Sequence, residues 1–393
     1  MKWRKKQKLE NEIIYFDNAA STYVYDEVID YVNLINKDFY ANSSSSHFLG
    51  ISSYAKFKAH KETLCDILHI KPSSLIFTSG GAESNNFALK GIAFANYLKN
   101  SNIVISAYEH PTIRNTAKYL EKFGFEIRIC PLKNDSNLDI DILKTMIDEK
   151  TILLSTAHVC SELGTLTDIQ KISSLVKSIN PRCYYHVDAV QSFGKFHINL
   201  SDLNNIDMMS FSSHKIHGPK GVGALYIKPK TNIDPFICGS VDAGLRAGTI
   251  NLSGICGFTK ASEIIYSNIE KKYEHTKKLN QYLIDNLTAL DIELKINTPL
   301  ESSPYIINIA FKDIKSEVLL NALSKRNICV SSGSACASKS KVSETLKAMN
   351  LSKDYIEGAI RLSFSDKNTI KEIDIFIQNL KELIPKLKLF VRR

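Results

Sequence analysis

Short apolar runs alternate with amphipathic stretches between residues 75 and 227, and most of the runs end in a turn of polar or glycine residues. Apolar runs of about 4 to 8 residues bounded by turn residues are typical of buried strands, whereas the longer periodic stretches predict helices. Because strands that alternate with helices pair in parallel, we predict an α/β fold with a mostly parallel sheet and ligands at the carboxyl ends of its strands. The expected strands are 75–78, 102–106, 126–130, 151–157, 184–188, 206–211 and 223–227.

The chain has 393 residues, which is more than one compact core usually accommodates, so two domains are expected. After the last of these runs come a glycine-rich loop over 238–249 and a long amphipathic helix predicted from 255 to 289. We predict a large domain over 14–255 and a small α+β domain over 256–393, which also includes residues 1–13. The small domain is expected to contain strands at 305–311, 328–331 and 360–363 and helices at 316–325 and 343–349.

The formal net charge of +9 is concentrated at the two ends of the chain. Residues 1–9 carry five basic groups and no acid, and residues 381–393 carry five basic groups against Glu382, so +5 and +4 account for the whole excess. We interpret these ends as solubilising tails or a docking patch for an acidic partner, and we expect no direct nucleic-acid binding. No apolar run approaches the ~20 residues of a membrane span, and no secretory signal begins the chain. The scattered cysteines predict no metal site and favour a reducing cytoplasm.

Lys215 lies in a turn between two short strands, flanked by His214 and His217 and followed by several glycines. The amine of a lysine held in such a turn can be shielded from water. Its pKa then falls, and the amine becomes a nucleophile able to form a Schiff base. The same residues are compatible with a basic β-turn that carries a surface lysine. Upstream, Asp188 ends a buried strand, and a strand-end aspartate together with a lysine is what a pyridoxal phosphate site requires.

A second candidate site begins where the strand at 75–78 ends in Ser79-Gly80-Gly81 before a helix. Free backbone N–H groups at a glycine-rich helix start suit an anion such as phosphate, and the nearby side chains of Ser79, Ser84, Asn85 and Asn86 strengthen this interpretation slightly. Further along, Glu109, Ser161, Asp188 and Lys215 all fall at the carboxyl ends of strands, so we expect them to face one pocket. His110 either satisfies a turn before Pro111 or stacks on a cofactor ring.

Two more candidates follow in the C-terminal third. Cys336 stands in a run of small residues, 331–338, where a thiol is more accessible than among Val, Ile and Leu and could act as a nucleophile. Arg361 falls within a strand pattern, where its guanidinium could bind a substrate carboxylate or form an ordinary salt bridge. Near the N-terminus, residues 40–50 form a serine-rich loop, whose serines could cap a helix from about 52 to 68.

Together these segments resemble the cysteine desulfurases of the NifS/IscS type, within the class V aminotransferases of fold-type I pyridoxal phosphate enzymes. The resemblance extends from about Phe16 to Ser365, and the motifs occur in the family's order. The lysine and cysteine motifs are the most specific of them. The matching segments are Tyr15-Phe-Asp-Asn-Ala-Ala, Phe77-Thr-Ser-Gly-Gly-Ala-Glu-Ser-Asn-Asn, Glu109-His, His186-Val-Asp-Ala-Val-Gln, Ser212-Ser-His-Lys-Ile-His-Gly-Pro-Lys-Gly, Arg246-Ala-Gly-Thr and Ser331-Ser-Gly-Ser-Ala-Cys-Ala-Ser.

The resemblance implies a seven-stranded sheet sandwiched by helices and a role for each matching residue. Lys215 would hold pyridoxal 5'-phosphate and move protons, Asp188 would pair with the pyridinium nitrogen, and His110 would stack on the ring. Gln191 would contact the phenolic oxygen. The phosphate would be held by Gly81, Ser212 and His214, with Thr249 contributed by the other subunit of a homodimer.

For the substrate, the resemblance implies that Asn42 and Arg361 bind the carboxylate of L-cysteine. Cys336 would attack its sulfur, which leaves alanine and an enzyme-bound persulfide. The sulfur would then pass to an acceptor or scaffold protein, for iron–sulfur cluster assembly or for thiolation.

The chain departs from the family's pattern at four places. Ala82 stands where the phosphate turn usually has a threonine, and Ser161 stands where the ring-contacting loop has an amide. The segments 238–242 and 364–365 also differ. Two alternatives therefore stay open at this point. One is another class V aminotransferase or lyase in which Cys336 is incidental. The other is a cofactor-poor relative that acts as a binding partner.

Overall fold

The computed structural model describes residues 13–239, 244–332, 343–349 and 351–391, so Cys336 lies outside the described residues. Its largest sheet has seven strands in the order β2-β8-β7-β6-β5-β3-β4. All neighbours pair in parallel except β8, which runs antiparallel to β2 and β7. This confirms the predicted mostly parallel seven-stranded sheet. The strands are β2 (Leu75–Thr78), β3 (Asn102–Ser106), β4 (Glu126–Cys130), β5 (Thr151–Ala157), β6 (Tyr184–Asp188), β7 (Met208–Ser212) and β8 (Gly223–Ile227).

Helices cover both faces of this sheet, because successive side chains of each strand point to opposite sides. In β2, Leu75 and Phe77 join one buried apolar cluster and Ile76 joins another. The Ile76 cluster is covered by α3 (Gly81–Ala95) and α4 (Pro111–Leu120). The opposite face is covered by α1 (Asp26–Asp38), α2 (Phe48–Leu68), α5 (Ile140–Met146), α6 (Ile169–Ile179) and α7 (Leu252–Tyr266).

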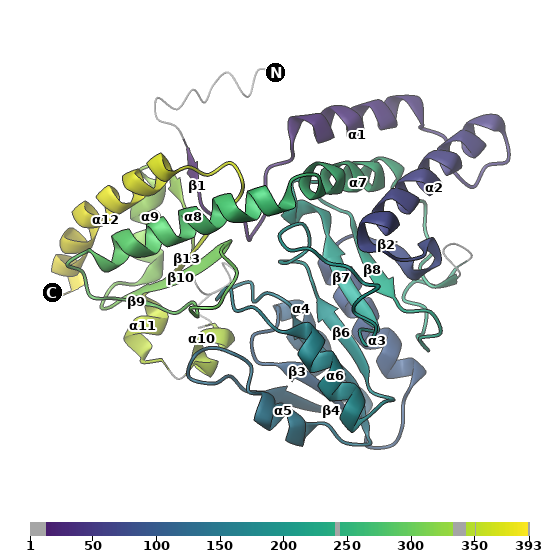
Figure 1. Cartoon of the computed structure of the whole chain (residues 1–393), viewed down its shortest axis with the longest axis horizontal. Coiled ribbons are helices and arrows are strands. Elements are labelled where there is room, and N and C mark those ends of the chain that lie inside the picture. Colours follow the sequence, from purple (N-terminus) through teal and green to yellow (C-terminus); the bar gives the residue numbers. More distant parts are fainter. Residues whose placement is uncertain (1–12, 240–243, 333–342, 350, 392–393) are drawn as a thin grey trace.

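A second, antiparallel sheet in the order β12-β13-β10-β9 forms in the C-terminal part, which Figure 1 shows at the other side of the molecule. Its apolar cluster includes Phe16, whose ring makes edge contacts with Phe364 at 5.5 Å and Phe376 at 6.0 Å between centroids. The strand β1 (Ile14–Tyr15) pairs in parallel with β11 (Ile328–Cys329), so the N-terminal segment packs with the C-terminal part. The other elements are β9 (Leu294–Ile296), β10 (Ile306–Phe311), β12 (Ser331–Ser332), β13 (Ala359–Ser363), α8 (Ile269–Thr288), α9 (Ser316–Ser324), α10 (Glu344–Ala348), α11 (Lys353–Glu357) and α12 (Ile370–Val391).

The single long helix predicted from 255 to 289 is wrong, because the structure has two helices there. The chain leaves the helical conformation at Asn268, whose φ of −147° lies between the end of α7 and the start of α8. The two helices also bury different faces: Ile265 of α7 belongs to the cluster of the large sheet, whereas Leu279 of α8 belongs to that of the small sheet. The exact domain boundary, predicted at residue 255, stays a prediction.

Two smaller expectations also need correction. The helix α2 begins at Phe48, earlier than predicted, and it is capped by His47, whose Nδ1 accepts a hydrogen bond from the Gly50 amide, rather than by a serine. The strand predicted over 328–331 is two short strands in different sheets, β11 and β12. Within the described part of the chain, no helix combines the length and the apolar character needed to cross a membrane.

Candidate active site

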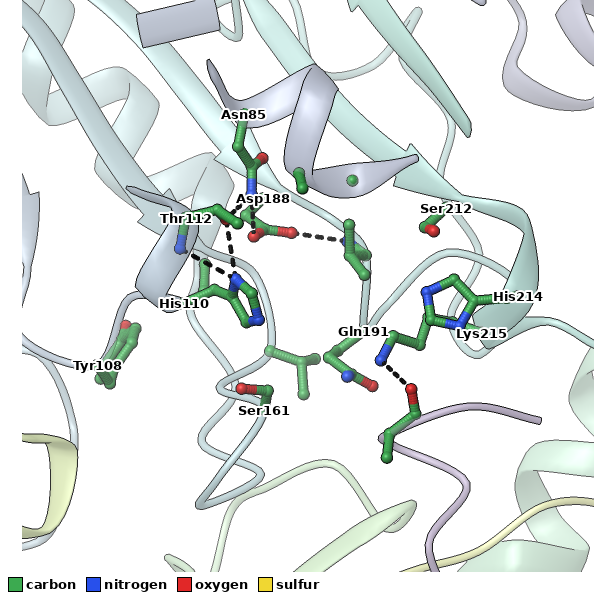
Figure 2. Close-up of a pocket in the computed structure, with 16 residues that line it drawn as sticks. Asn85, Tyr108, His110, Thr112, Ser161, Asp188, Gln191, Ser212, His214 and Lys215 are labelled. Atoms are coloured by element: carbon green, nitrogen blue, oxygen red, sulfur yellow. Dashed lines mark hydrogen bonds between the residues drawn. The ribbon is translucent and has the colours of Figure 1, made fainter. Parts of the chain in front are cut away.

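A cavity of about 300 Å³ opens at the carboxyl ends of the parallel strands. Figure 2 shows its lining residues, which come from four strand ends, the start of α3 and the segment after β1. Most of the predicted site residues meet there, although they are spread over more than a hundred positions of the sequence. Those that line the cavity are Gly81, Ala82, His110, Ser161, Asp188, Gln191, Ser212, His214 and Lys215.

Lys215 reaches the cavity from a short 3₁₀ turn, residues 213–215, that directly follows β7. Its Nζ donates hydrogen bonds to the carbonyl oxygens of Ala19 at 2.5 Å and Ala20 at 2.8 Å. Burial and the nearby cation of Arg361 lower the pKa of Lys215 to about 8, against the opposing effect of Asp17 and Asp188. A neutral amine is therefore accessible near physiological pH, as a nucleophile requires.

Asp188 ends β6, and both of its carboxylate oxygens are engaged. Oδ2 accepts a hydrogen bond from Asn85 Nδ2 at 2.8 Å, and Oδ1 accepts one from the Val190 amide at 2.9 Å. The side chain is 6% exposed, so these bonds hold a carboxylate at a fixed place in the cavity wall. Such a carboxylate can stabilise a positive charge on a bound ligand.

His110 caps the start of α4, and its ring is oriented by Thr112. The Thr112 amide donates to His110 Nδ1 at 3.2 Å, and Thr112 Oγ1 lies 2.8 Å from the same nitrogen. Asn85 Nδ2 also donates to Thr112 Oγ1 at 3.0 Å, so a hydrogen-bonded chain links His110 to Asp188. Loss of water around the ring lowers the pKa of His110, which the carboxylate of Asp188 partly offsets. With Nδ1 accepting, a neutral ring carries its proton on Nε2.

The start of α3 forms an anion-compatible corner of the cavity. Gly80 precedes the helix with a φ of 149°, and no side chain caps the first N–H groups. A side chain at Gly81 would bring its Cβ to 2.6 Å from Val190 Cγ2, so only glycine leaves this corner open. The buried hydroxyl of Ser212 has no hydrogen-bond partner among the described residues, and His214 lines the same cavity. Free helix N–H groups and an unpaired hydroxyl are suited to a phosphate.

Four predicted residues do not line the cavity. Thr249 lines a separate hollow of about 100 Å³ with Arg246. Asn42 is exposed, and its Oδ1 accepts a hydrogen bond from the Ser44 amide. Arg361 is buried, and its guanidinium donates at 2.8 Å both to the Ser161 carbonyl and to Asp17 Oδ1. Cys336 lies outside the described residues.

The structure corrects the expectation that Glu109 faces the pocket. Its carboxyl group is 1% exposed behind the cavity wall, where Ser106 Oγ donates to Oε1 at 2.8 Å. Burial and the neighbouring charge of Asp188 raise the pKa of Glu109 to about 8. A strand-end position places a side chain at the correct edge of the sheet, but the face on which it emerges depends on the turn that follows.

The polar side chains near the glycine turn also differ from expectation. Ser84 Oγ donates to the Ala224 carbonyl, and Asn86 Nδ2 donates to the Ala82 carbonyl, so both turn away from the cavity. Only Asn85 reaches it, where it binds Asp188. Thr112 was not among the predicted site residues, although it lies two residues after His110 and orients its ring. Within the described parts of the chain, no group of three or more His, Cys, Asp and Glu side chains is arranged to hold a metal ion.

Comparison with known proteins agrees with this geometry. The sequence model of the family described as Aminotransferase class-V matches residues 14–376. The cysteine desulfurase IscS of Dictyoglomus turgidum is 36% identical over 378 residues, which cover 95% of this chain and 95% of that protein. The chain belongs to the NifS/IscS cysteine desulfurases. This confirms the resemblance seen in the sequence motifs.

Two solved structures share the fold of most of the chain. A structure described as a NifS-like protein superposes with a TM-score of 0.90 at 34% identity, covering 96% of this chain and all of that one. A second structure, described as SspA in complex with cysteine, has a TM-score of 0.79 at 30% identity and covers 91% of this chain and all of that one. The fold-type I architecture expected from the motifs is therefore confirmed.

Proposed function

We propose that this desulfurase removes sulfur from L-cysteine at the cavity that Lys215 and Asp188 share, and releases L-alanine. The observation that carries the proposal is the meeting of an amine of lowered pKa and a fixed carboxylate at one cavity of about 300 Å³. Membership of the desulfurase family supports this reaction over an amino-group transfer. The related structure described as a complex with cysteine supports L-cysteine as the substrate.

The residues of the cavity fit pyridoxal 5'-phosphate as cofactor. The unpaired hydroxyl of Ser212 and the open start of α3 suit its phosphate, with His214 beside them. Asp188 suits its ring nitrogen, and the amine of Lys215 suits its aldehyde carbon. Ala82 and Ser161, two of the departures from the family's pattern, also line the cavity. When bound, this cofactor supplies an electron sink that makes the Cβ–S bond of cysteine breakable.

Lys215 is suited to transfer protons, and His110 is suited to donate a hydrogen bond. An amine with a pKa of about 8 is present in both protonation states near neutral pH, so Lys215 Nζ can accept a proton and return it. His110 is neutral under the same conditions because its pKa is lowered, and its Nε2 carries the proton when Nδ1 accepts from Thr112. The ring therefore offers a hydrogen-bond donor to the bound substrate.

The substrate's carboxylate is assigned to Arg361 and Asn42, as the family resemblance implies. Arg361 is already held by Asp17 and by the Ser161 carbonyl, and its buried Nε has no partner among the described residues. An oriented guanidinium with an unused donor is suited to a carboxylate. Asn42 is exposed and would approach only from its loop.

Cys336 is the proposed sulfur acceptor. Its thiolate attacks the sulfur of the substrate, the S–S bond forms as the Cβ–S bond breaks, and Cβ takes up a proton to become alanine. Residues on both sides of the segment that carries Cys336 contact residues near the cavity. Ser331 pairs with Arg361 across β12 and β13, and Ser343 donates a hydrogen bond to Glu162, which follows Ser161.

The setting of the reaction is also proposed from the resemblance. The protein would act in the cytoplasm as a homodimer, in which Thr249 of one subunit contacts the phosphate in the other. The separate hollow of Thr249 is consistent with this, because Thr249 does not line the cavity of its own chain. The persulfide sulfur would pass to a scaffold or acceptor protein.

The test is the visible absorbance of the purified protein, followed by alanine and sulfide release from L-cysteine with a reductant. We expect a yellow protein that forms both products in equal amounts, and a Cys336→Ala variant that releases no sulfide. The exposed Cys238 gives a matched control, since Cys238→Ala should behave as the wild type.

Sulfide release by Cys336→Ala at the wild-type rate would contradict the role of Cys336. A yellow protein that instead transfers amino groups from other amino acids would indicate another class V reaction, and a protein that never colours would indicate loss of the cofactor.

A further inference from the structure

A second lysine, Lys195, is buried directly behind the cavity. The turn that places it depends on Gly194, whose φ of 70° and close approach to Ile216 leave no room for a Cβ. Lys195 is 6% exposed and lines a narrow hollow that it shares with Lys215. Among the described residues, no carboxylate oxygen lies within 4.0 Å of its Nζ, which makes it an unusual buried cation.

The contacts of Lys195 are directed at one cavity residue. Its Nζ donates a hydrogen bond to Gln191 Oε1 at 2.9 Å and lies 5.7 Å from the centre of the Tyr305 ring. A protonated lysine has donors only, so in that form it can accept nothing from the amide of Gln191. It therefore selects the amide orientation in which the oxygen faces Lys195 and the nitrogen faces the other way.

A second contact imposes the same orientation. The carbonyl oxygen of Ala19 accepts a hydrogen bond from Gln191 Nε2 at 2.8 Å, and the same oxygen accepts from Lys215 Nζ. An unbroken chain of hydrogen bonds therefore runs from Lys195 through Gln191 and Ala19 to Lys215. Gln191 lines the cavity with its oxygen turned toward Lys195, and Nε2 keeps one N–H beyond its bond to Ala19 that can donate to a bound ligand.

We propose that Lys195 is a positioning residue of the active site, which holds Gln191 as an obligatory donor toward an oxygen of the bound cofactor. The cofactor's phenolic oxygen is the group that this donor would meet. This proposal rests on the proposed function, since it needs pyridoxal phosphate in the cavity. Burial together with the charges of Lys215 and Arg361 lowers the pKa of Lys195 to about 7, which is consistent with a desolvated amine retained at a functional site.

The experiment is a pH titration of the visible absorbance of the cofactor-loaded, full-length protein, compared among three variants. Lys195→Met removes the donor and the charge while it keeps the length of the side chain. Gln191→Leu removes the amide. Lys171→Met is the matched control, because Lys171 is an exposed lysine on α6.

A donor to a phenolic oxygen stabilises its anionic form, so its loss makes the chromophore more basic. We expect Lys195→Met and Gln191→Leu each to raise the midpoint of the titration by about one pH unit, a tenfold change in proton affinity, on the scale of pKa shifts caused by hydrogen bonds and nearby charges. Adding Lys195→Met to Gln191→Leu should then change the midpoint little, because Lys195 acts through Gln191. Lys171→Met should titrate as the wild type.

The outcomes separate the two proposals. A wild type that neither takes up pyridoxal phosphate nor forms alanine overturns the proposed function. A wild type that does both, with unchanged midpoints in Lys195→Met, overturns the role of Lys195. Full, undiminished shifts from Lys195→Met in the Gln191→Leu background show that Lys195 does not act through Gln191, which also overturns it. Should Lys195→Met not fold, an unshifted Gln191→Leu protein is sufficient to overturn the proposal.

Discussion

Asn85 Nδ2 donates a hydrogen bond of 2.8 Å to Asp188 Oδ2, although the two residues are 103 positions apart in the chain. The same amide nitrogen contacts Thr112 Oγ1 at 3.0 Å, so one side chain at the start of α3 orients both the acid and, through Thr112, the imidazole of His110. The site thus depends on a residue that carries no chemistry of its own.

Replacing Asn85 should lower the affinity of the protein for the cofactor. Asn85→Leu removes a hydrogen bond to a charged group, which contributes about 1.5 to 3 kcal/mol, so we expect a roughly 10- to 150-fold weaker affinity for pyridoxal phosphate. The affinity is measured from visible absorbance as the cofactor is added. Asn86→Leu is the matched control, because Asn86 lies on the same helix and turns away from the cavity. Equal losses in the two variants would mean that the helix, not the contact with Asp188, is responsible.

The lowered pKa of Lys215 predicts a pH dependence of its reactivity. Only the neutral amine reacts, and a pKa of about 8 makes that form available at lower pH than in an ordinary lysine. In protein freed of cofactor, acetylation of Lys215 should therefore rise with a midpoint near pH 8, as measured by mass spectrometry. Arg361→Leu should move this midpoint upward, because it removes a nearby cation and leaves Asp17 unpaired. Arg326→Leu, which breaks a surface pair with Glu382, should leave it unchanged.

Glu162 should control sulfur transfer without affecting cofactor binding. Its buried carboxyl group accepts hydrogen bonds from Ser343 and from Thr345 Oγ1, and Arg114 lies 3.9 Å away. Glu162→Ala would leave these groups unpaired, at a cost of about 1 to 3 kcal/mol for each unsatisfied buried group.

For Glu162→Ala we expect at least a tenfold slower release of sulfide and an unchanged cofactor content. We also expect faster hydrogen exchange at the Leu346 amide, which normally donates a hydrogen bond to Ser343 Oγ. Glu344→Gln is the control, since Glu344 pairs with Lys347 at the surface. Wild-type sulfide release in Glu162→Ala would show that this contact does not position the segment with Cys336.

The packing of Phe16 joins the N-terminal segment to the C-terminal part. Its ring is fully buried between Phe364 and Phe376, so Phe16→Ala should lower the free energy of unfolding by about 3 to 5 kcal/mol. Ile13→Ala, three residues earlier and 53% exposed, should change it by less than about 0.5 kcal/mol. Chemical unfolding followed by circular dichroism distinguishes the two. A small effect of Phe16→Ala would indicate that the N-terminal segment detaches before the rest unfolds.

Much of the fold and the identity of the main site residues follow from the sequence alone. The alternation of apolar runs and helical periods predicts the parallel sheet, because local hydrogen bonding and burial depend mainly on neighbouring residues. Ser161, Asp188 and Lys215 are predicted to face one pocket because each lies at the carboxyl end of a strand, and the structure places all three there. The motifs around Lys215 and Cys336 indicated the family, which the comparisons confirm.

The tertiary structure decided what each of these residues contacts. Arg361 binds Asp17 across 344 positions, and Asn85 rather than Ser84 or Asn86 reaches Asp188. Glu109 lies near the carboxyl end of a strand, as Asp188 does, yet its side chain is buried and does not line the cavity. The direction of a side chain depends on the turn after its strand and on the elements packed against it. The distances between side chains from different elements are set only when the two sheets and their helices are assembled. Local pattern therefore selects the residues that can form a site, and long-range packing selects those that do.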